Sequence, residues 1–171
     1  MRIIGLDPGL RHTGWGVIEV AGNRLGHVAH GKVSSDADQP LAWRLRQLYD
    51  GLCRIIESYA PEEAAVEETF VNKNPSSTLK LGQARGVVML AAATSELTIA
   101  EYPPNLIKKS IVGTGHAQKR QVAMMVATLL PGAGALGPDA ADALATAICH
   151  AHHRQTQGRI AEAVRAQEVL P

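Results

Sequence analysis

Aromatic residues and cysteines are scarce in this sequence. Its 171 residues include two tryptophans, three tyrosines and a single phenylalanine, Phe70. So few rings exclude a base-stacking surface built from many aromatic side chains. The two cysteines, Cys53 and Cys149, lie far apart and in no paired motif. We expect reduced, half-buried thiols, which argues against a disulfide-stabilised scaffold and against a cysteine-based metal site.

An excess of charge and a long apolar run are also missing. The formal net charge is only +1, so any claim of nucleic-acid binding must rest on local charge. The longest apolar stretch, around residues 86–93, is too short to span a membrane. Asp7 and Pro8 interrupt the apolar N-terminus too early for a secretory signal. We therefore expect a cytoplasmic protein without membrane attachment.

The length and the hydrophobic content of 46% suit one globular domain with a substantial core. We place this domain at residues 1–157. Residues 158–171 are only weakly amphipathic, and we expect a mobile or loosely docked C-terminal tail there.

The apolar pattern predicts an α/β fold. Three runs at 2–6, 14–20 and 25–33 read as an antiparallel meander, and a helix from Pro40 to before Pro61 leads into a fourth strand at 64–67. Such a crossover normally makes the first and fourth strands parallel neighbours. A fifth strand at 97–102 completes a mixed sheet of predicted order 3-2-1-4-5 with helices on both faces. The further predicted helices are 77–95 (capped by Ser76 or Ser77), 105–111, 118–130 and 139–155.

Four carboxylates stand where such a fold gathers its ligands. Asp7 and Glu67 each close an apolar strand, while Asp139 and Asp142 open the last helix. If the two strands are neighbours, their ends lie about 5 Å apart. Carboxylates without sulfur or imidazole at ligand spacing favour Mg²⁺ or Mn²⁺. Because such sites usually run phosphoryl transfer, we predict a metal-dependent nuclease or a phosphotransferase.

Each acid also has a structural alternative. Asp139 follows Gly-Pro and can be a simple helix cap, whereas Asp142 lies past the cap position. Strand alternation puts Glu67 and Glu68 on opposite faces, and the sequence does not decide which face holds the site. His150 and His153, three residues apart, can chelate a metal, but a solvated helix face is the favoured interpretation.

Basic residues cluster locally in spite of the balanced total. No acid occurs between residues 103 and 122. Phe70 lies in a polar context at a strand exit, which suits stacking on or wedging between bases, although a role in the core stays open. We predict that Phe70 acts together with a positive DNA-binding surface. Its basic members are Lys73, Lys80, Arg85, Lys108, Lys109, Lys119 and Arg120.

Four motifs in order resemble the RuvC family of bacterial Holliday-junction resolvases, in the ribonuclease-H-like superfamily. They are IGLDPG at 4–9, VEETF at 66–70, KLGQARG at 80–86 and DAADA at 139–143, and the resemblance covers residues 1 to about 155. Each motif alone is modest, but the four together at family spacing are highly specific.

The resemblance implies a structure-selective endodeoxyribonuclease that nicks two strands of like polarity symmetrically in a four-way junction, leaving 5′-phosphate ends. It implies two Mg²⁺ ions per active site, with Mn²⁺ as a substitute, held by Asp7, Glu67, Asp139 and Asp142. Phe70 would stack on bases, and Lys108 and Lys119 would lie beside the scissile strands. The implied partners are a second copy of the chain, for which the helix at 77–95 suits the interface, and the RuvA–RuvB branch-migration complex. Glu68 stands where the family commonly has an amide, and no role follows for it.

Other classes fit less well. A sugar-kinase or actin-like ATPase needs a duplicated fold, for which 171 residues are too few. A binding module without catalysis does not require four converging acids. A ribonuclease-H-like nuclease that processes RNA stays open, because residue spacing does not distinguish junction, duplex, flap and RNA substrates.

Overall fold

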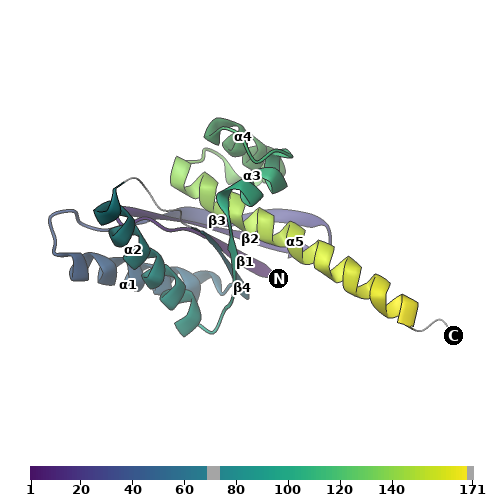
Figure 1. Cartoon of the computed structure of the whole chain (residues 1–171), viewed down its shortest axis with the longest axis horizontal. Helices are drawn as coiled ribbons and strands as arrows, with labels where there is room; N and C mark the ends of the chain where they lie inside the picture. The colour runs from purple at the N-terminus through teal and green to yellow at the C-terminus, as the bar shows by residue number, and fades with distance from the viewer. Residues whose placement is uncertain (69–73, 169–171) are drawn as a thin grey trace.

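A five-stranded sheet forms the centre of the molecule. The computed structural model describes residues 1–68 and 74–168. The strand order is β3-β2-β1-β4-β5, as the sequence predicts (Figure 1). The strands are β1 (Arg2–Asp7), β2 (His12–Ala21), β3 (Arg24–Ser34), β4 (Glu63–Glu67) and β5 (Thr98–Tyr102).

The central strand β1 is apolar on both faces because helices cover both. Ile3 belongs to one hydrophobic cluster, while Ile4 and Leu6 belong to the other, and all three side chains are fully buried. β1 runs antiparallel to β2 and parallel to β4, and Leu6 pairs with Val66. This register brings the ends of β1 and β4 to the same edge of the sheet.

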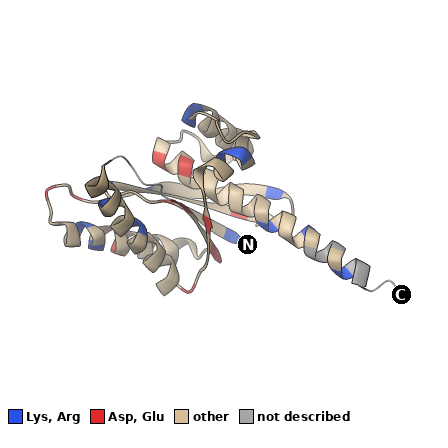
Figure 2. Ribbon diagram, in the orientation of Figure 1, with Lys and Arg blue, Asp and Glu red and all other residues tan. Residues whose placement is uncertain are grey.

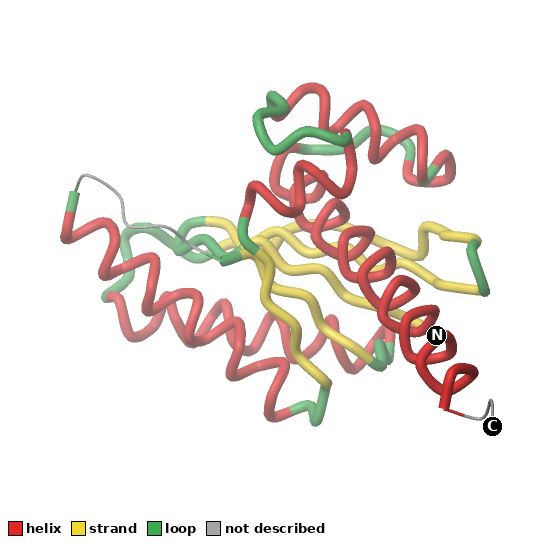
Figure 3. Tube along the Cα trace, turned by 45° about the vertical axis from the view of Figure 1, so that its right-hand side comes forward, coloured by secondary structure: helices red, strands yellow, loops and turns green. Residues whose placement is uncertain are grey.

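Helices cover the two faces of the sheet, again as predicted (Figure 3). α1 and α2 pack on one face together with Ile4, Leu6 and Val66. α5 crosses the other face, and α3 and α4 pack on α5. The helices are α1 (Leu41–Tyr59), α2 (Pro75–Thr94), α3 (Pro104–Val112), α4 (Lys119–Leu129), the short 3-10 helix η1 (Pro131–Ala133) and α5 (Pro138–Glu168).

The start of α2 differs from the prediction. Ser76 and Ser77 were expected to cap the helix, but Asn74 is the cap: its side-chain oxygen accepts hydrogen bonds from the backbone N–H groups of Ser76 and Ser77, at 3.0 and 3.2 Å. Pro75 occupies the first helical position, where its missing N–H costs nothing. The capping prediction was therefore wrong by two or three residues.

The last helix is longer than expected. We predicted an end near Gln155, but α5 continues to Glu168, and its C-terminal part extends past the sheet (Figure 1). Gly158 is the weakest helix former between these residues, and one such glycine costs about 1 kcal/mol. The helix propensity of these residues therefore allows α5 to continue to Glu168. The boundary of the domain at residue 157 and the mobility of the tail stay predictions.

Both cysteines are free thiols. Cys149 is buried and Cys53 is half-buried, which agrees with the expected reduced state. Within the described ranges, no helix combines the length and apolarity that a membrane span requires.

Candidate active site

Asp7 and Glu67 meet at the carboxyl ends of two neighbouring parallel strands. Each stands directly after the paired residues Leu6 and Val66. Burial raises the pKa of Asp7, and the nearby Glu67 carboxylate raises it further. The prediction that these two acids face one site therefore agrees with the geometry.

Asp142 reaches the same place because α5 lies directly on the sheet. A Cβ atom added to Gly5 would collide with the carbonyl oxygen of Ala143, and one added to Gly14 would collide with that of Asp139. Only glycine at these two strand positions lets the helix backbone approach so closely. Since Gly14 pairs with Asp7, the first turns of α5 lie above the end of β1.

A cavity of about 350 Å³ opens at this point. Acids from two strands and a helix line it together with two lysines and a set of apolar side chains. The lining residues are Asp7, Pro8, Glu67, Glu68, Leu81, Pro104, Ile107, Lys108, Lys119, Val122, Asp142 and Ala145.

Negative charge is concentrated and poorly solvated in this cavity. Burial, reinforced by the Glu67 and Asp142 carboxylates, raises the pKa of Asp7 to about 8. Burial followed by the Asp142 charge also raises the pKa of Glu67. The site therefore holds its carboxylates in the ionised form only if a cation offsets their charge.

Lys119 offsets part of that charge. Its Nζ lies 2.6 Å from Oδ2 of Asp142, and this hydrogen bond raises the pKa of the lysine. The Lys119 side chain is 77% exposed, so the ammonium group can leave without opening the core. Another cation can therefore take the place of the Lys119 ammonium group beside Asp142.

The donor chemistry of Asp7, Glu67 and Asp142 fits a hard divalent cation, since all their donors are carboxylate oxygens. Among the described residues, no three acidic, histidine or cysteine side chains already stand at metal-ligand spacing. Oδ2 of Asp142 is paired with Lys119. A metal ion that took this oxygen as a ligand would have to displace the Lys119 ammonium group.

Asp139 occupies a different position from the other three acids. It lies one turn before Asp142 and lines a shallow hollow with Gly31 and Lys32 of β3, not the carboxylate cavity. Its backbone carbonyl group and Cβ atom lie over Gly14 at the strand end. Its role as a metal ligand stays a prediction.

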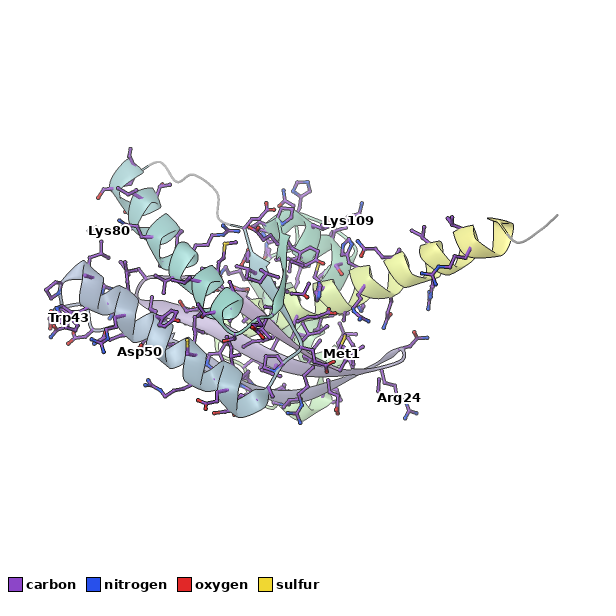
Figure 4. All side chains as sticks on the ribbon, turned by 90° about the horizontal axis from the view of Figure 1, so that it is seen from below. Met1, Arg24, Trp43, Asp50, Lys80 and Lys109 are labelled. Atoms are coloured by element: carbon purple, nitrogen blue, oxygen red, sulfur yellow. The ribbon has the colours of Figure 1, made fainter. Side chains whose placement is uncertain are left out.

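The predicted basic surface divides among several places. Lys108 and Lys119 line the carboxylate cavity. Lys109, the next residue on α3, lines a separate groove against α5. Arg120 lines a hollow beside Asp142, and Lys80 is exposed on α2, where Figure 4 labels it.

Arg85 is engaged within the protein. Its guanidinium forms an ion pair with Glu101 on β5 and also donates a hydrogen bond to the backbone oxygen of Glu67, at 3.5 Å. The sequence offered no signal for the Glu101 partnership. DNA contact by Arg85, Lys80 and Arg120 stays a prediction, and Phe70 and Lys73 lie outside the described residues.

His150 corrects another expectation. A solvated helix face was favoured for it, but the side chain is buried: its ring nitrogens lie 2.8 Å from the hydroxyl of Tyr102 and 2.7 Å from Glu63. Arg154 binds the other oxygen of Glu63 at 2.9 Å. The helix packs this face onto the sheet, so the histidine needs polar partners there.

Comparison with known proteins identifies the family of the chain. A family model described as "Crossover junction endodeoxyribonuclease RuvC" matches residues 3–150. The chain is 63% identical over 164 residues to RuvC of Paramagnetospirillum magneticum, covering 96% of this chain and 99% of the relative. It is 66% identical over 154 residues to RuvC of Rhodospirillum rubrum, covering 90% and 91%.

A solved structure extends the likeness to three dimensions. Thermus thermophilus RuvC in complex with a Holliday junction substrate superposes with a TM-score of 0.85 at 31% identity, over 92% of this chain and 96% of that chain. The fold is thus the ribonuclease-H-like fold that the sequence predicted. The chain belongs to the RuvC family, the crossover junction endodeoxyribonucleases.

Proposed function

We propose that this protein resolves four-way DNA junctions, cutting two strands of like polarity symmetrically and leaving 5′-phosphate ends. The observation that carries the proposal is the convergence of Asp7, Glu67 and Asp142 in one cavity, in a chain of this family. Such a cavity suits phosphodiester hydrolysis, because it concentrates oxygen ligands beside lysines that can face a phosphate.

Asp7, Glu67 and Asp142 would hold Mg²⁺, with Asp139 as the predicted fourth ligand and two ions per site. When bound, such ions supply Lewis-acid activation of water and stabilisation of the leaving 3′ oxygen. Lys108, on the rim of the cavity, is placed to offset the charge of the scissile phosphate. Lys119, once released from Asp142, becomes available for the same task.

A homodimer would present two such cavities to one junction. α2 supports this part of the proposal: Leu79 and Leu90 are 66% and 51% exposed, and no described atom outside the backbone of α2 lies within 4 Å of a Cβ added at Gly82 or Gly86. An apolar helix face with open glycines suits close packing against a second copy. We further place the protein in the cytoplasm, beside the RuvA–RuvB branch-migration complex.

The test is a cleavage assay on a synthetic four-way junction, with a linear duplex of the same sequence as the control. We expect two symmetric nicks in the junction only when Mg²⁺ is present, and nicked products that ligase seals without prior phosphorylation. Equal cleavage of the linear duplex, or an unchanged rate in EDTA, would contradict the proposal. An RNA duplex in the same assay tests the RNA-processing alternative.

Phe70 provides a second test of the proposal. Replacing it with alanine should slow junction cleavage at least tenfold while the thermal midpoint changes little, because a base-stacking ring acts on the substrate and not on the core. A collapse of thermal stability with a proportionate loss of activity would instead assign Phe70 to the core.

A further inference from the structure

A second groove lies between α3 and α5, on the side of α3 away from the carboxylates. Its volume is about 340 Å³, close to that of the carboxylate cavity. The lining residues are Leu106, Lys109, Ser110, His152, His153 and Thr156. The lining that the structure describes contains no carboxylate, in contrast to the cavity on the other side of α3.

The groove combines hydroxyl and imidazole groups with one fixed positive charge and the apolar side chain of Leu106. Lys109 is exposed at its rim, where Figure 4 labels it. His152 is half-buried, and its Nδ1 lies 3.1 Å from the hydroxyl oxygen of Ser110. Burial lowers the pKa of His152 below its usual value, and the hydrogen bond with Ser110 opposes this shift only in part, so the imidazole is neutral at neutral pH. Hydroxyl, imidazole and ammonium groups without an opposing acid are the groups that recognise phosphate oxygens.

The groove lies within reach of a DNA strand whose scissile bond is at the carboxylates. Ten residues of α5 separate Asp142 from His152, which corresponds to about 15 Å along the helix axis. One DNA strand advances 3.4 Å per nucleotide, so a backbone with its scissile bond at the carboxylates would extend to the groove after about four or five nucleotides. A duplex arm lying along α5 can therefore occupy both places.

We propose that the groove lined by Lys109, His152 and His153 binds a phosphodiester of the DNA arm that flanks the cleaved bond. This inference deepens the proposed function in naming DNA as the ligand. It concerns binding alone and does not require cleavage.

The first experiment compares Lys109→Gln with Arg24→Gln, which removes an equal charge from the exposed β2–β3 turn. Binding of the full-length proteins to a labelled four-way junction is measured without divalent cations across a range of KCl concentrations. We expect the magnitude of the slope of log affinity against log salt to decrease by about 0.9 for Lys109→Gln, the value for one lost phosphate contact, and to stay unchanged for Arg24→Gln. Equal slopes for both variants and the wild type would overturn the proposal.

The second experiment uses the wild-type fold and locates the phosphate. Single methylphosphonates are placed along one arm of the junction, each removing one backbone charge. Neutralising a phosphate about four or five nucleotides from the cleaved bond should weaken binding of the wild type severalfold but leave Lys109→Gln unaffected. Equal losses in both proteins at every position would refute a contact with Lys109.

A third measurement distinguishes the possible anions. Imidazole NMR signals of His152 and His153 are followed during titration with a DNA duplex, with inorganic phosphate or with a glutamate-rich peptide. We expect the duplex to shift both signals at the lowest concentration. A response to inorganic phosphate or to the peptide, but not to the duplex, would overturn the assignment to DNA. If the slope and the NMR shifts appear while junction cleavage fails, the groove stands and the proposed function does not.

Discussion

The two halves of α5 have the same secondary structure for different reasons. In the first half, every residue from 143 to 151 is buried, and the helix lies on glycines of β1 and β2. In the second half, residues 156–160 are all exposed, and the helix has left the sheet. Figure 2 shows acidic residues at the start of α5 and basic residues along its extension. Tertiary packing therefore holds the first half, local propensity holds the second, and only the first half carries the acid of the cavity.

Glycine substitutions should show the largest difference in stability between the two halves of α5. Gly5→Val should cost at least about 3 kcal/mol of unfolding free energy, because its side chain would collide with the backbone of α5 at Ala143 and Ala147. A Cβ added at Gly158 meets no described atom outside the backbone of α5 within 4 Å, so Gly158→Ala should instead stabilise the protein by about 0.5–1 kcal/mol. Urea unfolding followed by circular dichroism measures both. Similar effects of the two changes would show that the first half is not packed as described.

Asp142→Asn, in the first half of α5, should remove most of the cleavage activity while leaving the fold intact. We expect junction cleavage to fall on the order of 10²-fold or more, because the change removes an oxygen ligand and the partner of Lys119 without altering side-chain size. Gln157→Ala, on the exposed second half, is the control and should cleave at the wild-type rate. Thermal melting checks folding in both. Cleavage at the normal rate by Asp142→Asn would remove this acid from the mechanism.

The pH dependence of stability should reveal the raised pKa of Asp7, which lies beneath the first half of α5. Its folded pKa of about 8 lies above the unfolded value of 3.8, so the folded state retains the proton longer. Without metal, stability should therefore be greatest below about pH 4 as far as this group is concerned, and it should fall as the pH rises toward 8. Asp7→Asn should flatten this decline, and Mg²⁺ should reverse it in the wild type by stabilising the ionised carboxylates. Thermal midpoints between pH 4 and 9, in EDTA and in Mg²⁺, measure the effect. An identical pH profile for Asp7→Asn and the wild type would contradict it.

Removing residues 158–171 should have the smallest effect. Gln155 still donates to the carbonyl oxygen of Gly22 at 3.0 Å, which fastens the helix before the cut. We expect the free energy of unfolding to change by less than about 1 kcal/mol, since the side chains of Ile160 and Val164 are 59% and 48% exposed. Junction cleavage should persist. A large loss of stability would show that the extension belongs to the domain and would move its boundary past residue 157.

The periodicity of apolar residues in the sequence was sufficient to predict much of the fold. The sheet order follows from a meander of three strands and one helical crossover, because a crossover of that length makes neighbouring parallel strands. Asp7 and Glu67 could be placed together for the same reason: both follow strands that end at one edge. By contrast, neither the Asn74 cap nor the true end of α5 could be read with confidence from composition, since several residues near each end are compatible with a helix.

The sequence could not predict which side chains a helix turns toward a given cavity, because this depends on the rotation of the helix about its axis. Asp139 and Asp142 are three residues apart, and the spacing put both on one face, but only Asp142 lines the cavity with Asp7. Lys108 and Lys109 are adjacent in sequence and line different hollows on opposite sides of α3. His150 faces the sheet and not water, since Tyr102 and Glu63 lie there to bind it.

The amino-acid order by itself determined which strands neighbour one another and which acids end them, because both depend on the local alternation of apolar residues and on the length of a connection. The tertiary structure alone decided which side of α5 and of α3 faces the carboxylates. That choice depends on backbone contact at Gly5 and Gly14, where the absence of a side chain lets α5 rest on the sheet in one orientation. Contacts between residues more than a hundred positions apart set that rotation, and no local pattern encodes it.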